Sequence, residues 1–347
     1  MKIRLLLIAM AVAVTCNCQA PDKPMYGKGA FDKDGKPIEK EDPGNTGDPG
    51  DVTTEYDLIK IMSFNVLRTN NSDPADQKWS YRLPAIINMF KDISPDVVGL
   101  QECLESQIQD LQQELTDYTA LWIPTAQKNF GTCLMYKKGL FNQKGSGYLW
   151  FSDSPSTPSP AWKDYGCNDP TYRTYIWADL VHKEHGYKLY FYTTHFPRDY
   201  RELDPNSNNE TARIKCAQAM VDHAKNRVQD EDPVVFTGDF NWHLSDKDKG
   251  LDPFAPFMAW MKYAWQDLPS NAYDTYRAHN SFDGISPIAG AIRNSVDYIW
   301  YRNITPVRYR TVVEAYSNGK ENVKYISDHY PIVCTATVPY KKAATGN

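Results

Sequence analysis

The segment at residues 234–241, Val-Val-Phe-Thr-Gly-Asp-Phe-Asn, joins a run of β-branched and aromatic residues to a polar end. The run predicts a buried strand, and Gly238 lets the backbone turn tightly where that strand ends. Because side chains alternate along a strand, Asp239 and Asn241 are predicted to face one side and Phe240 the other. A carboxylate beside a carboxamide can hold a hard cation and a phosphate, but both residue types also favour ordinary turns. The segment alone leaves both interpretations open.

Strands and helices alternate on both sides of this segment. The predicted strands are Leu58–Val66, Val97–Glu102, Thr132–Tyr136, Leu149–Phe151, Thr174–Val181, Lys188–His195, Ser295–Tyr301, Arg308–Val313 and Ile332–Val338. Helical spacing is found over Leu83–Phe90, Leu104–Leu115 and Thr211–Val228, and in a Pro-containing region, Phe254–Tyr263. Many of these elements are joined by short turns, which indicates two packed sheets with helices outside. No linker-like stretch interrupts residues 57–340, so we predict one domain there.

Polar residues end strand after strand in this pattern. They are Asn65, Glu102, His195, Asp239 with Asn241, Asp297, and Asp328 with His329. Each has an ordinary alternative, as a turn residue, a helix start or a structural histidine. Asp297 is harder to explain in that way, because a carboxylate among apolar strand residues needs a partner. Since sites are usually built on the loops at one edge of a rigid sheet, the recurrence favours a functional site.

The ordered motifs carry a resemblance to a known family. Residues 63–65 (SFN), 100–102 (LQE), 193–195 (TTH), 237–241 (TGDFN), 295–298 (SVDY) and 327–331 (SDHYP) resemble those of the endonuclease/exonuclease/phosphatase superfamily, which has a deoxyribonuclease I-like fold. Residues 65–68, Trp79 with Arg82, and the Phe151–Trp162 loop are similar to its bacterial metal-dependent hydrolase branch. The resemblance implies a four-layer α/β-sandwich, in which two packed mixed β-sheets are flanked by helices.

The resemblance also implies a phosphate-ester hydrolase that uses Mg²⁺ or Mn²⁺. Carboxylate and carboxamide oxygens suit these cations, which keep several waters and bridge to phosphate. By similarity, Glu102 is the main metal ligand with Asn65 beside it. Asp239 and Asp328 are expected close enough to bind metal or position water, and Asn241 is expected to hold phosphate or water.

Proton transfer is assigned to three further residues. His329 is the candidate general base, since an imidazole titrates near neutral pH, and Asp297 would orient it. His195 is expected across the phosphate as a proton donor or hydrogen-bond donor. Arg173 is expected to grip a non-bridging oxygen, with an ordinary surface arginine as the alternative.

Arginines, the remaining histidines and the net charge bear on where a substrate would bind. We expect a local basic cleft formed by Arg68, Arg82, Arg173 and Arg198. The remaining histidines are predicted to be structural or at the surface: His182, His185, His223, His243 and His279. A net charge of −5 disfavours high-affinity binding to duplex DNA.

Several substrate classes and one different function remain open. The phosphate ester is predicted to belong to a nucleic acid, a phospholipid head group or a sugar phosphate, so an extracellular nuclease and a sphingomyelinase-like enzyme are both alternatives. The GxSxG element of serine hydrolases and the HExxH motif of zinc hydrolases are absent from the sequence. A non-catalytic surface-binding lipoprotein is the alternative from another class, and its basis is the aromatic content of 13%. We expect a monomer.

The N-terminal region predicts export. Residues 1–18 read as a signal, with Lys2 and Arg4 before an apolar run and Cys16 as the residue that would be lipidated. Residues 19–56 are predicted to be a flexible linker and residues 341–347 a tail. We therefore expect a protein anchored by lipid at a bacterial cell envelope, with no other membrane contact. The other cysteines lack CxxC spacing and predict neither a zinc site nor a disulfide scaffold.

Overall fold

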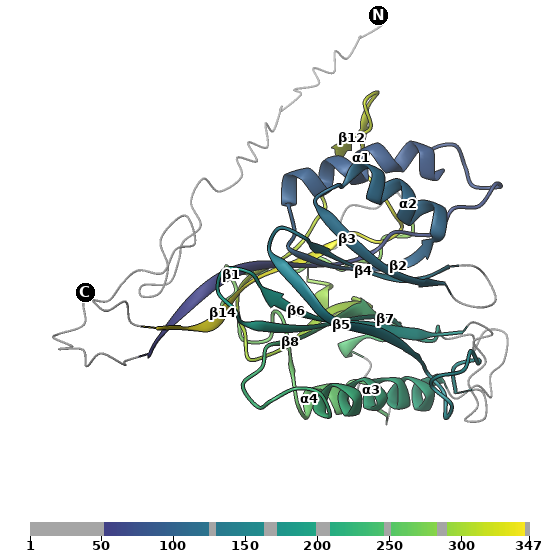
Figure 1. The fold of residues 1–347 in the computed structure, drawn as a ribbon. Coiled ribbons are helices and arrows are strands. Elements are labelled where there is room, and N and C mark those ends of the chain that lie inside the picture. The colour runs from purple at the N-terminus through teal and green to yellow at the C-terminus, as the bar shows by residue number, and fades with distance from the viewer. Residues whose placement is uncertain are drawn as a thin grey trace, which may run out of the picture. The chain divides into compact units, whose positions relative to one another are not determined.

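Two six-stranded sheets form the centre of the molecule. The structure is a computed structural model, and it describes residues 52–124, 130–162, 172–198, 209–245, 251–282 and 290–343. All of these belong to one compact unit, residues 45–347. In Figure 1 the two sheets lie face to face, with helices on the outer side of each. The predicted four-layer α/β-sandwich is confirmed.

The first sheet has the strand order β11-β14-β1-β2-β4-β3. Its strands are β1 (Val52–Asn65), β2 (Val97–Leu104), β3 (Tyr118–Pro124), β4 (Phe130–Lys137), β11 (Thr305–Thr311) and β14 (Ile332–Ala343). Strands β1 and β2 are parallel and the other neighbours are antiparallel, so the sheet is mixed.

The second sheet has the order β5-β6-β7-β8-β10-β9 and is also mixed, with one parallel pair, β7 and β8. Its strands are β5 (Phe141–Trp150), β6 (Thr174–His182), β7 (Lys188–His195), β8 (Val234–Asp239), β9 (Lys262–Tyr263) and β10 (Asp297–Arg302). Each sheet therefore has one parallel pair near its centre, and the carboxyl ends of these pairs supply most of the predicted site residues.

Helices cover the outer faces of both sheets (Figure 1). Helices α1 (Trp79–Ile93) and α2 (Glu105–Glu114) lie on the first sheet, and α3 (Asn209–Lys225) and α4 (Ala255–Met258) on the second. A 3-10 helix, Ile292–Asn294, precedes β10, and a small hairpin joins β12 (Tyr316–Ser317) to β13 (Asn322–Val323). Apolar side chains of the first sheet and of helices α1 and α2 meet in a core. It includes Met62, Val98, Ile86, Phe90 and Leu111. No helix among the described residues is long and apolar enough to span a membrane.

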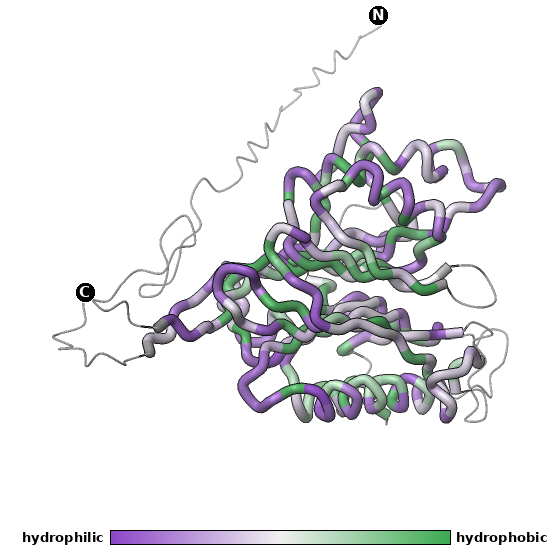
Figure 2. Tube along the Cα trace, in the orientation of Figure 1, coloured by the Kyte–Doolittle hydropathy of each residue, from purple (hydrophilic) through white to green (hydrophobic). Residues whose placement is uncertain are grey.

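The interface between the two sheets is close enough at one point to require a glycine. A Cβ atom on Gly99 of β2 would lie 2.1 Å from Oγ1 of Thr237 and 2.4 Å from Oγ1 of Thr193. Beside it, the Gln101 side chain donates a 3.1 Å hydrogen bond to Thr193. A few polar side chains thus meet within the otherwise apolar interface between the sheets. Figure 2 shows hydrophobic residues along the strands of both sheets.

Several parts of the fold differ from the sequence-based expectation. Residues 52–56, predicted as linker, begin β1, and residues 341–343, predicted as tail, end β14, where the two strands pair. The strand predicted as Leu149–Phe151 is the end of the longer β5. Strand β3 was not predicted, although residues 118–124 form a full edge strand against β4. The region Phe254–Tyr263, predicted as helical, has a single helical turn and then β9. Tyr263 and Lys262 pair with Trp300 and Tyr301 of β10. Because of this pairing, these residues are extended and not helical.

The described cysteines are core residues. Cys103, Cys133, Cys216 and Cys334 are all buried, as expected of small apolar residues in a core. Cys167, Cys16 and the predicted signal and linker up to residue 51 lie outside the described residues.

Candidate active site

The register of the second sheet lines up three predicted site residues on adjacent strands. In the parallel pair of β7 and β8, His195 lies opposite Asp239. In the antiparallel pair of β8 and β10, Asp239 lies opposite Asp297. His195 Nε2 is 3.5 Å from Asp239 Oδ2. The row of side chains follows directly from where the strands end.

The first sheet contributes Glu102 from a bulged strand. The register of β2 against β4 shifts between Leu100 and Cys103, and Glu102 at this shift has a φ of +57°. A positive φ costs a non-glycine residue conformational free energy, and a bulge redirects the side chain that it contains. The glutamate lines a cavity at the strand ends, so the strain lies where a site is expected.

Asp328 and His329 come from the segment that leads into β14. The Ser327 hydroxyl donates a 2.7 Å hydrogen bond to the Asn65 carbonyl, which ties this segment to the end of β1. The tie brings residues that are 262 positions apart in the chain to the same sheet edge. Both predicted residues line the same cavity as Glu102.

His329 is held between two carboxylates. Its Nδ1 donates a 2.8 Å hydrogen bond to Asp297 Oδ2, and its Nε2 is 3.8 Å from Asp239 Oδ2. Burial disfavours charge on the imidazole, but the carboxylates of Asp297, Asp328 and Asp239 outweigh it and hold the pKa of His329 well above its ordinary value. The ring is therefore oriented as a base, with Asp297 behind it and Nε2 toward Asp239.

Asp239 is the centre of the constellation. Asn65 Nδ2 donates a 3.1 Å hydrogen bond to its Oδ2, and the backbone N–H of Asn241 donates a 3.0 Å bond to its Oδ1. Burial, together with the charge of Asp297, raises the pKa of Asp239 despite these donors. Asn65 is 1% exposed and lies behind Asp239 rather than in the lining of the cavity, and Asp297 lies behind His329.

The predicted orientation of the 239–241 segment is confirmed, although a turn produces it. Strand β8 ends at Asp239, and Asn241 has a φ of +49°. Asn241 then lines the cavity with Asp239, its side chain donating a 3.0 Å bond to the Phe196 carbonyl, while Phe240 is fully buried.

His195 has an environment opposite to that of His329. Burial, and then the nearby charges of Arg173, His329 and Arg68, hold its pKa well below the ordinary value. Its buried Nδ1 has no hydrogen-bond partner among the described residues. A neutral imidazole can donate a hydrogen bond to a phosphate oxygen but is a poor acid, so this environment favours the hydrogen-bond donor of the two expected roles.

The cavity at the strand ends has a volume of about 510 Å³. Its lining includes the carboxylates of Glu102, Asp239 and Asp328. Burial, and then the charge of Asp328, raises the pKa of Glu102. Carboxylates that repel one another in a polar cavity are the oxygen donors that a hard divalent cation binds and neutralises. The residues present therefore fit a Mg²⁺-type ion.

The predicted basic cleft is correct for three of its four arginines. Arg68, Arg173 and Arg198 line the cavity. Arg82 was placed there wrongly: it is fully buried in α1. Its guanidinium donates hydrogen bonds to the carbonyls of Gln77, Val66, Leu67 and Ile326. Four convergent carbonyls satisfy a buried guanidinium, so Arg82 shapes the loop after β1.

Two histidines were predicted to be structural or at the surface but line the cavity. His243 follows β8, and its Nδ1 donates a 3.2 Å hydrogen bond to the Ser295 carbonyl. His279 packs its ring on His329, with centroids 4.8 Å apart. Burial, and then His329, lowers the pKa of His279 to about 4. No local motif marks His279, which a backbone pairing with His329 brings to the site. His243 lies two residues after Asn241, so its position in the chain could have pointed to the site.

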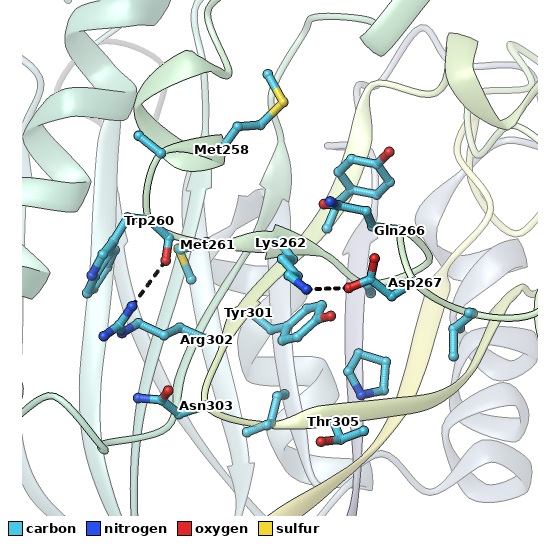
Figure 3. Close-up of a pocket in the computed structure, with 16 residues that line it drawn as sticks. Met258, Trp260, Met261, Lys262, Gln266, Asp267, Tyr301, Arg302, Asn303 and Thr305 are labelled. Carbon is cyan, nitrogen blue, oxygen red and sulfur yellow. Dashed lines mark hydrogen bonds and ion pairs between the residues drawn. The ribbon is translucent and has the colours of Figure 1, made fainter.

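A larger cavity of about 750 Å³ lies elsewhere, lined by residues 258–264, 266–268 and 301–306 (Figure 3). Its charged side chains are engaged with neighbouring groups: Lys262 with Asp267, and Arg302 with the Trp260 carbonyl. None of the predicted site residues lines it. Chemistry rather than size therefore identifies the smaller cavity as the candidate active site.

Comparisons with known proteins agree with this geometry. An uncharacterized protein of Acanthamoeba polyphaga mimivirus is 21% identical over 296 residues, which cover 79% of this chain and 98% of that protein. Two solved structures from Bacteroides thetaiotaomicron are each 22% identical. An endonuclease/exonuclease/phosphatase family protein has a TM-score of 0.69 and covers 82% of this chain and 97% of its own. A mannosyl-6-phosphatase has a TM-score of 0.66 and covers 80% and 99%.

At these identities the two structures establish a shared fold. The family assignment comes from the sequence itself: the model of the Endonuclease/Exonuclease/phosphatase family matches residues 62–329, a span that begins in β1 and ends at His329. The match covers most of the chain and includes the strand-end residues described above. This chain therefore belongs to the endonuclease/exonuclease/phosphatase family of hydrolases.

Proposed function

We propose that this protein is a Mg²⁺- or Mn²⁺-dependent phosphoesterase in which an activated water attacks phosphorus directly. The observation that carries the proposal is the hydrogen-bonded pair of His329 and Asp297 beside Asp239, at the wall of a cavity that also contains Glu102 and Asp328. This arrangement provides a candidate base, an orienting acid and oxygen donors for a cation within one site.

Glu102 and Asp328 would hold the cation, with Asp239 as a further donor. When bound, a divalent ion supplies positive charge that neutralises the carboxylates and the phosphate. Metal dependence is general in this family, and the surplus of carboxylates fits it.

His329 would accept the proton of the attacking water at Nε2. Asp297 fixes the ring by its 2.8 Å bond to Nδ1 and stabilises the imidazolium that forms. In the structure the carboxylates hold the pKa of His329 well above its ordinary value. The base therefore becomes available only when the charge of Asp328 and Asp239 is offset.

The opposite wall would bind the phosphate. Neutral His195 and the carboxamide of Asn241 are positioned to donate hydrogen bonds, and Arg173, which is 5% exposed, provides a guanidinium. Because His195 and Arg173 are buried, their orientation is largely fixed before substrate arrives, and preorganised donors stabilise a transition state best.

Three classes of phosphate ester are candidate substrates. The fold shared with a mannosyl-6-phosphatase favours a sugar phosphate as the first compound to test. A phospholipid head group, as for a sphingomyelinase-like enzyme, and extracellular nucleic acid are the alternatives. We also propose that the protein is exported and anchored through Cys16, on the basis of the charged and apolar pattern of residues 1–18.

A substrate panel tests the proposal. Purified protein with Mg²⁺ or Mn²⁺ is assayed on sugar phosphates, sphingomyelin, RNA, and single- and double-stranded DNA. We expect hydrolysis of one class, and its loss in the His329→Ala variant. If no phosphate ester in the panel is turned over, or if the variant matches the wild type, the proposed function is wrong.

A further inference from the structure

His279 is brought into the active site by a short backbone pairing. Asn280 N–H donates a 2.7 Å bond to the Asp328 carbonyl, and Tyr330 N–H donates a 2.8 Å bond to the Ala278 carbonyl. The pairing makes His279 and His329 direct cross-strand partners. Their side chains therefore project from opposed positions, which explains the 4.8 Å separation of the two rings.

The segment that follows His279 has a strained backbone and contacts the imidazole. Ser281 and Phe282 have φ values of +57° and +55°, in a region that costs non-glycine residues free energy. The Asn280 side chain accepts a 3.0 Å bond from Phe282 N–H and donates a 3.2 Å bond to the Ser327 carbonyl. The turn places the Ser281 hydroxyl 3.0 Å from His279 Nε2.

The donor atoms of His279, Asp328 and His329 lie within 4.8 Å of one another. Both nitrogens of His329 already face carboxylates, at 2.8 Å from Asp297 and 3.8 Å from Asp239. The ring of His279, in contrast, has its hydrogen bond at Nε2, with the Ser281 hydroxyl. The half-buried His279 is thus the imidazole of this group that is not held between two carboxylates, and one of its ring nitrogens lies near the Asp328 carboxylate.

We propose that His279, together with Asp328, supplies a nitrogen donor to a divalent transition-metal ion such as Mn²⁺ in the active site. The inference rests on the proposed function and deepens it, because it names the kind of ion the site selects. The other predicted ligands are oxygens, which suit Mg²⁺ equally well. An imidazole donor shifts the preference toward first-row transition metals, for which nitrogen is a favourable ligand.

Electron paramagnetic resonance of Mn²⁺ tests this assignment without reference to turnover. Titration of the full chain with Mn²⁺ gives the affinity, and pulsed measurements detect ¹⁴N nuclei bonded to the ion. We expect ¹⁴N coupling in the wild type and its loss in His279→Gln. We also expect Mn²⁺ affinity to fall by about tenfold or more, while Mg²⁺ affinity, measured by competition, changes much less.

His243→Gln is the matched control, because it removes another imidazole from the same cavity but one whose Nδ1 is held by the Ser295 carbonyl. This variant is expected to keep the ¹⁴N coupling and the Mn²⁺ affinity. Circular dichroism verifies folding, and His279→Asn serves as a second variant if the glutamine variant does not fold.

Two results would overturn the inference. One is ¹⁴N coupling and Mn²⁺ affinity that persist without His279. The other is a variant that loses turnover but keeps its Mn²⁺ affinity, which would make His279 a positioning residue for His329. In both cases the proposed phosphoesterase activity would survive in the wild type. A wild type that binds no Mn²⁺ and hydrolyses no phosphate ester would instead reject both proposals.

Discussion

His329 and His195 are two imidazoles of one cavity whose surroundings differ. Carboxylates hold the pKa of His329 above its ordinary value, whereas burial and nearby cations hold that of His195 below it. Environments that push two titratable groups apart in this way define the positions of a base and of a neutral hydrogen-bond donor. The division of roles therefore follows from which residues surround each ring.

Replacing His329 with Ala should lower kcat by roughly two or more powers of ten while the fold persists, because the proton acceptor is lost. Asp297→Asn should have a weaker effect in the same direction, since the ring remains but loses its orienting carboxylate. Steady-state kinetics on the substrate found in the panel measures both. His185→Ala, whose ring stacks on Tyr340 outside the cavity, is the control. A His329→Ala rate close to that of the wild type would remove this residue from the mechanism.

Arg82 shows how one buried side chain stabilises a whole element. Its guanidinium joins α1 to the loop after β1 and to Ile326, just before Asp328. Arg82→Met would leave several carbonyls without a donor and should lower the free energy of unfolding by about 3 kcal/mol or more. Urea denaturation measures this loss.

Arg310→Met is the matched control, because Arg310 forms a partly exposed ion pair with Glu314. Its loss should cost less than about 1 kcal/mol. If the two variants are equally stable, the carbonyl cluster around Arg82 does not support the fold as described.

Strand β2 approaches β7 and β8 so closely at Gly99 that a larger residue should destabilise the packing of the two sheets. In Gly99→Ala the new methyl would overlap Thr237 and Thr193 across the sheet interface, so one sheet must shift. We expect a loss of about 1–3 kcal/mol in thermal or urea unfolding. Gly139→Ala, where a Cβ would meet nothing within 4 Å, is the control. Equal stability of the two alanine variants would contradict the close approach of the sheets.

The elements that the sequence predicts well are those with clear periodicity. Strand β7 has the predicted bounds, Lys188–His195, and β8 follows from its apolar run. Strand β3 was missed because it is an edge strand, half-buried through much of its length. The length of the helix at α4 was overestimated. The apolar residues of this region are divided between one helical turn and strand β9, which pairs with β10.

In the candidate site, too, some residues could be identified from the sequence and others could not. Residues that directly end a strand, such as Asp239 and His195, could be identified from the chain alone. His279 and Arg82 could not, since a backbone pairing with residues 328–330 places the first and four distant carbonyls bury the second. Asn65 was expected beside Glu102 as a ligand, and in the structure its side chain donates a hydrogen bond to Asp239, a contact that the sequence does not predict.

At the scale of the whole molecule, a half-buried neutral histidine makes stability depend on pH. His223 on α3 has its pKa lowered to about 4 by burial and by Arg227. In the unfolded chain a histidine titrates near about 6.5. Above that pH both states are neutral, and between about 6.5 and 4 only the unfolded state binds the proton. The contribution of His223 is therefore complete above the unfolded pKa and is lost as pH falls through this window.

His223→Gln should consequently show a shallower loss of unfolding free energy between pH 6.5 and pH 4.5, by up to about 1.4 kcal/mol per pH unit. Urea unfolding at three pH values gives the slopes. The comparison isolates one group, because Glu102 and Asp239, with raised pKa values, contribute with the opposite sign in both proteins. Parallel curves for the two proteins would show that His223 does not titrate as described.

The cavity as a whole is proposed to work only with a divalent cation. Dialysis against EDTA, followed by rate measurements on bis-p-nitrophenyl phosphate or on the substrate found in the panel, tests this dependence. We predict that chelation abolishes turnover, that Mg²⁺ or Mn²⁺ restores it, and that Glu102→Gln responds poorly to either ion. Turnover that survives complete chelation would contradict the assignment of Glu102 and Asp328 to a catalytic metal.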